Sequence, residues 1–144
     1  MRLGLLVLPL VLACGGTTAT APDQGRRLGM IAGFQSNDPH ITVVPSGRTV
    51  TVSVTTYGGG CESQGETEVV VNGLNAVVTP YDYTKVPVGG ACTDILRSFV
   101  HTTSIQFAGP GTAQITVRGL GWRTRTPKNP DGDTMSVVRT VELQ

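Results

Sequence analysis

The segment RTVTVSVTTY, residues 48–57, alternates apolar and hydroxyl-bearing side chains along its centre. Val50, Val52 and Val54 fall on one side of an extended chain, because successive side chains of a strand point to opposite faces. The intervening threonines and serine fall on the other side. In a helix, Val52 would lie on the side opposite to Val50 and Val54. The segment is therefore predicted to be a β-strand with one buried face and one solvated face.

Other segments share this extended character. Strands are predicted at residues 27–34, 41–44, 67–71, 74–79, 95–108, 111–119 and 136–143. In residues 95–108, Phe99, His101, Ile105 and Phe107 fall on one face. No convincing amphipathic helix occurs, and the chain is rich in valine, threonine and glycine. We therefore predict an all-β, antiparallel β-sandwich of about seven to eight strands, with a small β-barrel as the alternative.

One strand junction has a specific turn signal. Asn72-Gly73 lies between two predicted strands, and this pair tolerates the positive φ angles of a tight hairpin. Further along, FAGPGTAQITVRG, residues 107–119, resembles the penultimate-strand region of bacterial immunoglobulin-like domains. The resemblance implies an immunoglobulin-like or fibronectin-III-like sandwich. The antibody spacing of Cys, Trp and Cys is absent, because Trp122 follows both downstream cysteines.

Length and charge limit the classes of function. The chain has 144 residues, enough for one domain with a core, and its formal net charge is +1. Charged residues make up 15% of the sequence. Nucleic-acid-binding domains are usually clearly basic, so a nucleic-acid partner is not expected.

The N-terminus has the pattern of an export signal. Arg2 precedes the apolar run 3–12, which is too short for a transmembrane helix of roughly 20 residues. The following Val11-Leu12-Ala13-Cys14 resembles the lipobox of bacterial lipoproteins. The resemblance implies removal of residues 1–13 and attachment of diacylglycerol and a further acyl chain, such as palmitate, at Cys14. An ordinary signal peptide, leaving Cys14 as a thiol, is the alternative.

The resemblance also implies a location. Gly15, rather than an aspartate, follows the cysteine, which favours the outer over the inner membrane if the source has two. Residues 14–26 are predicted to be the lipidated cysteine and a tether rich in Gly, Thr, Ala and Pro. The β-sandwich domain is then predicted at 27–144. We expect a lipid-anchored protein of the bacterial cell envelope.

Two cysteines remain. Cys61 and Cys92 both lie in glycine-rich segments, and in an exported protein two such cysteines usually form a disulfide. A redox or metal-binding pair is the alternative. The sequence has no C-x-x-C motif, and neither cysteine has a histidine close to it. We therefore predict a structural disulfide.

The sequence offers little for catalysis. His101 shares a predicted buried face with phenylalanines and is expected at the edge of the core, while His40 is expected in a solvated turn. No G-x-S-x-G motif is present. The segment NPDGD, residues 129–133, has oxygen ligands but lacks the glycine and glutamate of a helical calcium loop, and is interpreted as a turn. We predict no enzyme activity, cofactor or metal.

Two aromatic segments are candidate binding sites. Residues 118–128 gather Trp122, Arg123 and Arg125, a combination that can stack on sugar rings, rest on anionic lipid head groups or hold an acidic partner. A solvated hairpin loop with Trp122 covering the core is the alternative. Tyr81 and Tyr83 lie in a second segment, TPYDYTK, which is expected to be a loop. If both loops occupy one end of the sandwich, they would form a joint surface.

We therefore expect a membrane-anchored envelope lipoprotein whose non-catalytic domain serves as a protein-interaction or structural module. A glycan- or cell-wall-binding module, using Trp122 and the tyrosines, is the main alternative. A hydrolase using His101 and a protease inhibitor are less favoured.

Overall fold

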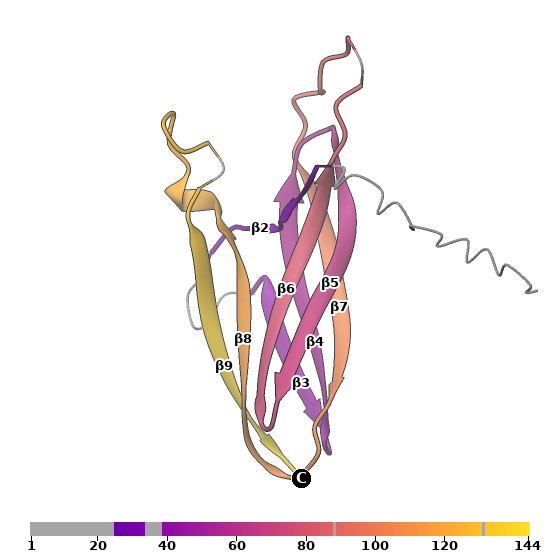
Figure 1. Ribbon diagram of the computed structural model, residues 1–144, viewed down its shortest axis with the longest axis vertical. Helices are drawn as coiled ribbons and strands as arrows, with labels where there is room; N and C mark the ends of the chain where they lie inside the picture. Colours follow the sequence, from indigo (N-terminus) through magenta and orange to yellow (C-terminus); the bar gives the residue numbers. More distant parts are fainter. Residues whose placement is uncertain (1–24, 34–38, 88, 131) are drawn as a thin grey trace, which may run out of the picture.

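The strands form two layers that enclose an apolar interior (Figure 1). The computed structural model describes residues 25–33, 39–87, 89–130 and 132–144. The first layer has three long strands: β3 (Ile41–Ser46), β4 (Thr49–Gly58) and β7 (Arg97–Gln106). The second layer has four: β5 (Glu62–Asn72), β6 (Asn75–Thr84), β8 (Gly111–Gly121) and β9 (Thr134–Leu143). The predicted all-β sandwich is confirmed.

A short N-terminal segment crosses between the layers. It consists of β1 (Arg26–Leu28), which pairs with β6, and β2 (Met30–Ile31), which pairs with both β8 and β4. The predicted strand 27–34 is thus broken at Gly29. A Cβ atom there would lie 2.5 Å from the Thr56 methyl carbon, so only glycine fits the crossing without a shift of its neighbours.

Most strand pairs are antiparallel, while β6 pairs with β8, and β2 with β8, in parallel. In the described part of the chain, the ladders run from β5 through β6, β8, β2 and β4 to β3, with β7 and β9 as further branches. They do not return to their starting point. The sandwich is therefore open, and the small barrel that the sequence also allowed is not formed.

The core follows the alternation of the sequence. Val50, Val52 and Val54 are fully buried, and Phe99 and Ile105 are buried on the inner side of the neighbouring strand β7, as is Phe107 just after it. The main apolar cluster also takes residues from the other layer, including Val78, Ile115, Val117 and Leu143. Thr49, Thr51, Ser53 and Thr55 of β4 point outward, whereas Thr56 is buried on the inner side. The two-residue period of the sequence thus sets which side chains fill the interior.

One end of the sandwich is closed by short turns, and we call it the turn end. The β3–β4 turn has Gly47 at a φ of +60°, and the β5–β6 turn has Gly73 at +61°. The second hairpin lies one residue later than the Asn72-Gly73 signal indicated, because Asn72 pairs with Asn75 and leaves Gly73 and Leu74 as the turn. Glycine supplies the positive φ that these tight turns require.

The N-terminal predictions lie almost wholly outside the described residues. The signal peptide, Cys14 and the tether up to residue 24 belong to this part. The described sandwich begins with Arg26 in β1, one residue before the predicted boundary. Within the described ranges, no helix is long and apolar enough to cross a membrane. The helical segment found there is the 3-10 turn η1 (Trp122–Thr124).

Candidate functional site

The end opposite the turn end carries the longer connections, and we call it the loop end (Figure 1). The β6–β7 connection covers residues 85–96, and the β8–β9 connection covers residues 122–133. The short β4–β5 turn, residues 59–61, is at this end too. The described chain also enters here, because the Thr84 N–H donates to the Gly25 carbonyl oxygen (3.0 Å).

A disulfide fastens the β6–β7 connection to the β4–β5 turn. Cys61 and Cys92 are bonded, with their Cα atoms 5.2 Å apart, which confirms the predicted pair. The Gly60 N–H donates to the Thr93 carbonyl oxygen (3.2 Å) beside it, and the Lys85 N–H donates to the Cys61 carbonyl oxygen (3.0 Å). Closing a loop over 31 positions stabilises a fold by about 3.7 kcal/mol in the chain-entropy model.

Trp122 borders an open apolar hollow of about 210 Å³ at the loop end. The hollow is lined by Ala32, Tyr57, Leu96 and Trp122. Trp122 is 39% exposed and Leu96 is 67% exposed. The sequence pointed to Trp122 but not to its neighbours, because they come from three other parts of the chain.

The basic residues beside Trp122 have different surroundings. The Arg125 guanidinium lies 5.2 Å from the Trp122 ring centre, and its Nε donates to the Pro130 carbonyl oxygen (2.6 Å). Arg123 is exposed in η1. The predicted turn at 129–133 is held by a bond from Asn129 Nδ2 to Asp133 Oδ1 (2.9 Å). Of that turn, residue 131 lies outside the described residues.

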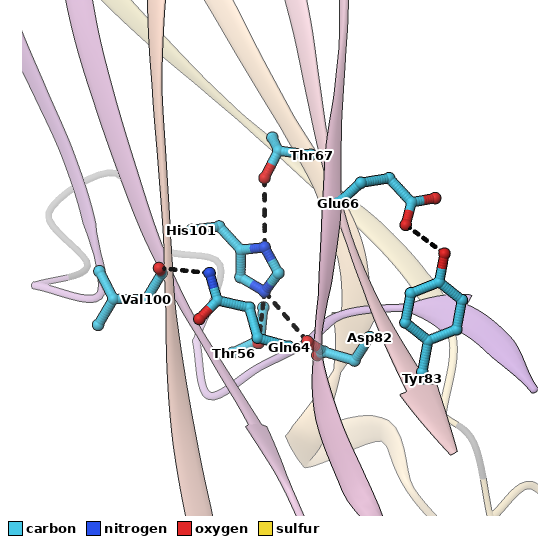
Figure 2. Close-up of polar contacts among 8 residues, drawn as sticks. All are labelled: Thr56, Gln64, Glu66, Thr67, Asp82, Tyr83, Val100 and His101. Carbon is cyan, nitrogen blue, oxygen red and sulfur yellow. Dashed lines mark hydrogen bonds and ion pairs between the residues drawn. The ribbon is translucent and has the colours of Figure 1, made fainter. Parts of the chain in front are cut away.

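Tyr81 and Tyr83 are part of β6, not of a loop, which corrects the prediction for this segment. They point outward because Asp82 between them points into the interior. The Arg26 guanidinium covers the Tyr81 ring at 3.5 Å, and the Tyr83 hydroxyl donates to Glu66 (2.6 Å; Figure 2). The two tyrosines therefore do not form a joint loop surface with Trp122.

The surroundings of Glu66 favour the charged form of its carboxylate. The hydrogen bond from the Tyr83 hydroxyl is the main reason that the pKa of Glu66 is lowered from its usual value. Arg26, which is ion-paired with Glu66, acts in the same direction.

His101 lies inside the sandwich in a polar network (Figure 2). Asp82 Oδ1 is 3.0 Å from His101 Nε2, and Thr56 Oγ1 is 3.1 Å from the same nitrogen. Thr67 Oγ1 is 3.2 Å from Nδ1. His101 is 2% exposed and Asp82 is fully buried. The histidine is thus deeper than the edge position that the sequence suggested.

The network resembles a catalytic arrangement only in composition. Both ring nitrogens of His101 already have partners within the protein. Its ring is closed off from solvent, so a substrate has no access to it in this conformation. Ser98, close to His101 in sequence, points to the opposite, outer face of β7. The arrangement fits a buried structural network, in which each polar group needs a partner.

Two buried atoms beside this network have no partner. They are Asp82 Oδ2 and Arg27 Nε, from residues that are direct neighbours across β1 and β6. The terminal nitrogen of Arg27 pairs with Glu62 (2.6 Å), which is itself mostly buried. An ordered water molecule between such atoms is the usual way to satisfy them.

His40 is half-buried and bonded, in contrast to the solvated position expected for it. Its Nδ1 lies 3.0 Å from the Tyr57 hydroxyl, and the two rings meet edge to face. Among the described residues, no group of three or more His, Cys, Asp or Glu side chains is placed to hold a metal ion.

The outer face of the first layer was not singled out from the sequence. We call it the hydroxyl face: its outward residues are Thr42, Val44, Thr49, Thr51, Ser53, Thr55, Ser98, Val100, Thr102, Ser104 and Gln106. Ser53 and Thr102 hydroxyls are 3.0 Å apart across β4 and β7. Of all residues in the fully described strands β3, β4 and β7, Arg97 alone carries a fixed charge.

The second layer differs. Its strands β5, β6, β8 and β9 contain Glu62, Glu66, Glu68, Asp82, Arg118, Arg139 and Glu142. The signal for the hydroxyl face was present in the sequence as an absence of fixed charge in residues 41–47, 49–57 and 98–106, with Arg48 in the turn between the first two segments. It becomes a single surface only when the three strands pair.

Comparisons with protein-family models, curated proteins and solved structures find no match to this chain.

Proposed function

We propose that the protein is a lipid-anchored component of the bacterial cell envelope whose sandwich is a non-catalytic module for binding another envelope protein. The anchor is the acylated Cys14 that the lipobox-like sequence implies. The observation that carries the binding role is the uncharged hydroxyl face.

Protein surfaces are normally rich in charged side chains, whereas the centres of protein interfaces are depleted in them. The hydroxyl face has this composition over three adjacent strands. Val44 and Val100 are 59% and 56% exposed on it, and hydroxyl groups surround them. When a partner covers such a face, no charged side chain has to give up its hydration. The face also offers apolar area together with hydrogen-bonding groups. This composition fits a protein partner better than an acidic polymer or a metal.

A photoreactive residue at Thr102, on the hydroxyl face, tests the proposal in intact cells. The matched control places it at Thr140, which is exposed on the outer face of β9. We expect one dominant adduct with an envelope protein from Thr102 and none from Thr140. Equal labelling from both positions, or none from either, would contradict the binding role. An adduct with a second copy of this chain would replace the envelope partner with self-association.

Charge on the face provides an independent test. Val100 and Val70 are equally exposed, at 56%, but Val70 lies on the outer face of the second layer. Val100→Lys is expected to remove the Thr102 adduct, because it places an ammonium group where the partner would bury it. Val70→Lys is expected to leave the adduct unchanged. Loss of the adduct in both variants would point to a general effect of charge instead.

The anchor itself is tested by the intact mass of the full-length protein made in a bacterial host. The expected mass is that of a chain beginning at Cys14 with its acyl groups, and Cys14→Ser is the control. A mass without acyl groups would remove the anchor from the proposal.

A glycan-binding role is favoured by one feature only, the partly exposed Trp122 at the hollow. It predicts retention on purified cell-wall polysaccharide that Trp122→Ala weakens.

A further inference from the structure

We infer that the loop end lies against the lipid surface that holds Cys14, with Trp122 and Leu96 in the head-group layer. This inference rests on the proposed anchor and goes beyond it, because it fixes the orientation of the domain. The turn end then points away from the membrane, and the hydroxyl face stands upright and is open to a partner from the side.

The first argument is the place where the chain enters the sandwich. The Gly25 carbonyl oxygen accepts a hydrogen bond from the Thr84 N–H at the loop end, and Cys14 precedes Gly25 by eleven residues. Eleven residues span at most about 40 Å even when fully extended. The long strands have 10 or 11 residues, so the turn end lies roughly 35 Å beyond the loop end. The turn end could therefore reach the membrane only if these eleven residues were almost fully extended, whereas the loop end is close to the anchor at any extension.

The second argument is the chemistry of the loop end. Its exposed apolar side chains are Val86, Ile95, Leu96 and Trp122, and the last two line the hollow. Tryptophan favours the boundary between water and hydrocarbon, because its ring is apolar and its N–H group needs a partner. A group of such residues beside a lipid anchor adds apolar area that can leave water on contact.

The third argument is charge. The basic residues around these apolar side chains are Lys85, Arg97, Arg123, Arg125 and Lys128, all exposed. The acidic residues described in the same loops are Asp94 and Asp133, while Glu62, at the start of β5, is mostly buried and ion-paired with Arg27; Asp131 lies outside the described residues. The excess of positive charge suits anionic lipid head groups. Arg125 also lies over the Trp122 ring, which places a cation and an aromatic ring at one point.

The fourth argument is that part of the surface is held in shape. The Cys61–Cys92 disulfide and the Gly60–Thr93 hydrogen bond fix the β6–β7 connection just before Ile95 and Leu96. A surface that is already ordered loses less conformational entropy when it docks. The loop end therefore needs no large rearrangement to meet a lipid layer.

Trp122 is the only tryptophan of the chain, so its fluorescence reports on this surface directly. The experiment reconstitutes the full-length, acylated protein into vesicles of equal parts phosphatidylcholine and phosphatidylglycerol. The reference is the same acylated protein kept soluble by an amphipathic polymer, without lipid or detergent. We expect the emission maximum of Trp122 to lie at a shorter wavelength in the vesicles than in this reference. We also expect quenching when the phosphatidylcholine is brominated on its acyl chains.

Two pairs of variants separate docking from mere proximity. Leu96→Asp is expected to abolish the quenching, whereas Val70→Asp, at another exposed apolar position that lies toward the turn end, is expected to preserve it. Arg123→Gln is expected to lower the ratio of docked to undocked protein about fivefold, the effect of one basic residue near anionic lipid. Arg48→Gln, in the β3–β4 turn at the turn end, is expected to leave this ratio unchanged.

The possible failures are distinguishable. An acylated protein with unquenched Trp122 would overturn the docked orientation and leave the anchor in place. A protein without acyl groups would overturn both. If Trp122 responds to purified cell-wall polysaccharide and not to vesicles, the loop end is a glycan surface and the inference is wrong.

Discussion

The interior of the sandwich is built differently toward its two ends. The half nearer the turn end has an apolar core of valine, isoleucine and phenylalanine, closed by tight turns at Gly47 and Gly73. The half nearer the loop end contains the His101–Asp82 network, the crossing at Gly29 and the disulfide. Its connections are long and leave apolar side chains exposed.

This difference shows two ways of holding sheets together. Apolar packing has no direction, so it tolerates small changes of shape at modest cost. Hydrogen bonds between buried groups are directional, and a lost partner leaves a desolvated polar atom behind. The loop half is therefore expected to respond sharply to changes that the turn half would tolerate. It also presents the residues proposed to contact lipid, so the stability of this half and its proposed contact with lipid are coupled.

The largest effect is expected from His101→Leu, a change of similar size in the loop half. It leaves Asp82 buried without its partner, and breaking a buried pair in this way costs about 3–5 kcal/mol of unfolding free energy. Urea denaturation followed by circular dichroism measures the loss.

The double variant His101→Leu/Asp82→Leu provides the control. Because it removes both polar groups, it is expected to lose less stability than the sum of the two single variants. The network would not be a coupled unit if His101→Leu lowered the unfolding free energy by less than about 1 kcal/mol. The same would hold if the losses of His101→Leu and Asp82→Leu simply added in the double variant.

The disulfide comes next. Cys61→Ser/Cys92→Ser is expected to lower the unfolding free energy by about 3.7 kcal/mol, since the unfolded chain regains the freedom of the closed loop. Native-state hydrogen exchange is expected to quicken most at Gly60 and Ile95, which hydrogen-bond to Thr93 near the bridge. If exchange quickened first in the β5–β6 turn, the disulfide would be stabilising the turn end and not the loop end, which would contradict this prediction.

The turn half could be predicted from the sequence in some detail, because its information is local. The alternation in residues 48–57 placed Val50, Val52 and Val54 in the core, and each is buried. The tight hairpin after β5 was found to within one residue. Period and turn chemistry act over a few residues, so they can be recognised before any tertiary contact is known.

The loop half could not be predicted to this extent, because its contacts join distant segments. The disulfide was expected, since the sequence has only two cysteines after Cys14 and the lipobox-like segment implies export, where two such cysteines usually pair. The partner of His101 was not, because Asp82 lies 19 positions away on another strand. The turn-like composition around Tyr81 hid a strand, since its pairing with β1 and β5 decides its structure.

Ile105→Val tests the tolerance of the turn half. Ile105 is buried opposite Val50, and removing one methylene from such a site typically costs about 0.5–1.5 kcal/mol. The measurement is the shift in urea midpoint at an unchanged slope. A loss as large as that of His101→Leu would mean that the two halves do not differ in tolerance.

The smallest effect is expected on the outer surface of the loop half, at Glu66. Its pKa is lowered in the folded protein, first by the Tyr83 hydroxyl and also by Arg26. Because the folded pKa lies below the unfolded one, this carboxylate stabilises the fold above its ordinary pKa of 4.5, and the contribution is lost as the pH falls through the folded pKa. The site is exposed, so Glu66→Gln is expected to cost at most about 1 kcal/mol at neutral pH.

The pH dependence separates this contribution from a simple loss of packing. The difference in unfolding free energy between the native protein and Glu66→Gln is expected to shrink as the pH falls below 4.5 and through the lowered pKa of Glu66 in the folded protein, because the native carboxyl is then increasingly protonated. Glu68→Gln is the matched control, because Glu68 meets the same Arg26 at a longer distance of 3.6 Å. A difference that stays constant from neutral to acidic pH would show that shape, and not charge, is what Glu66 contributes beside Tyr83.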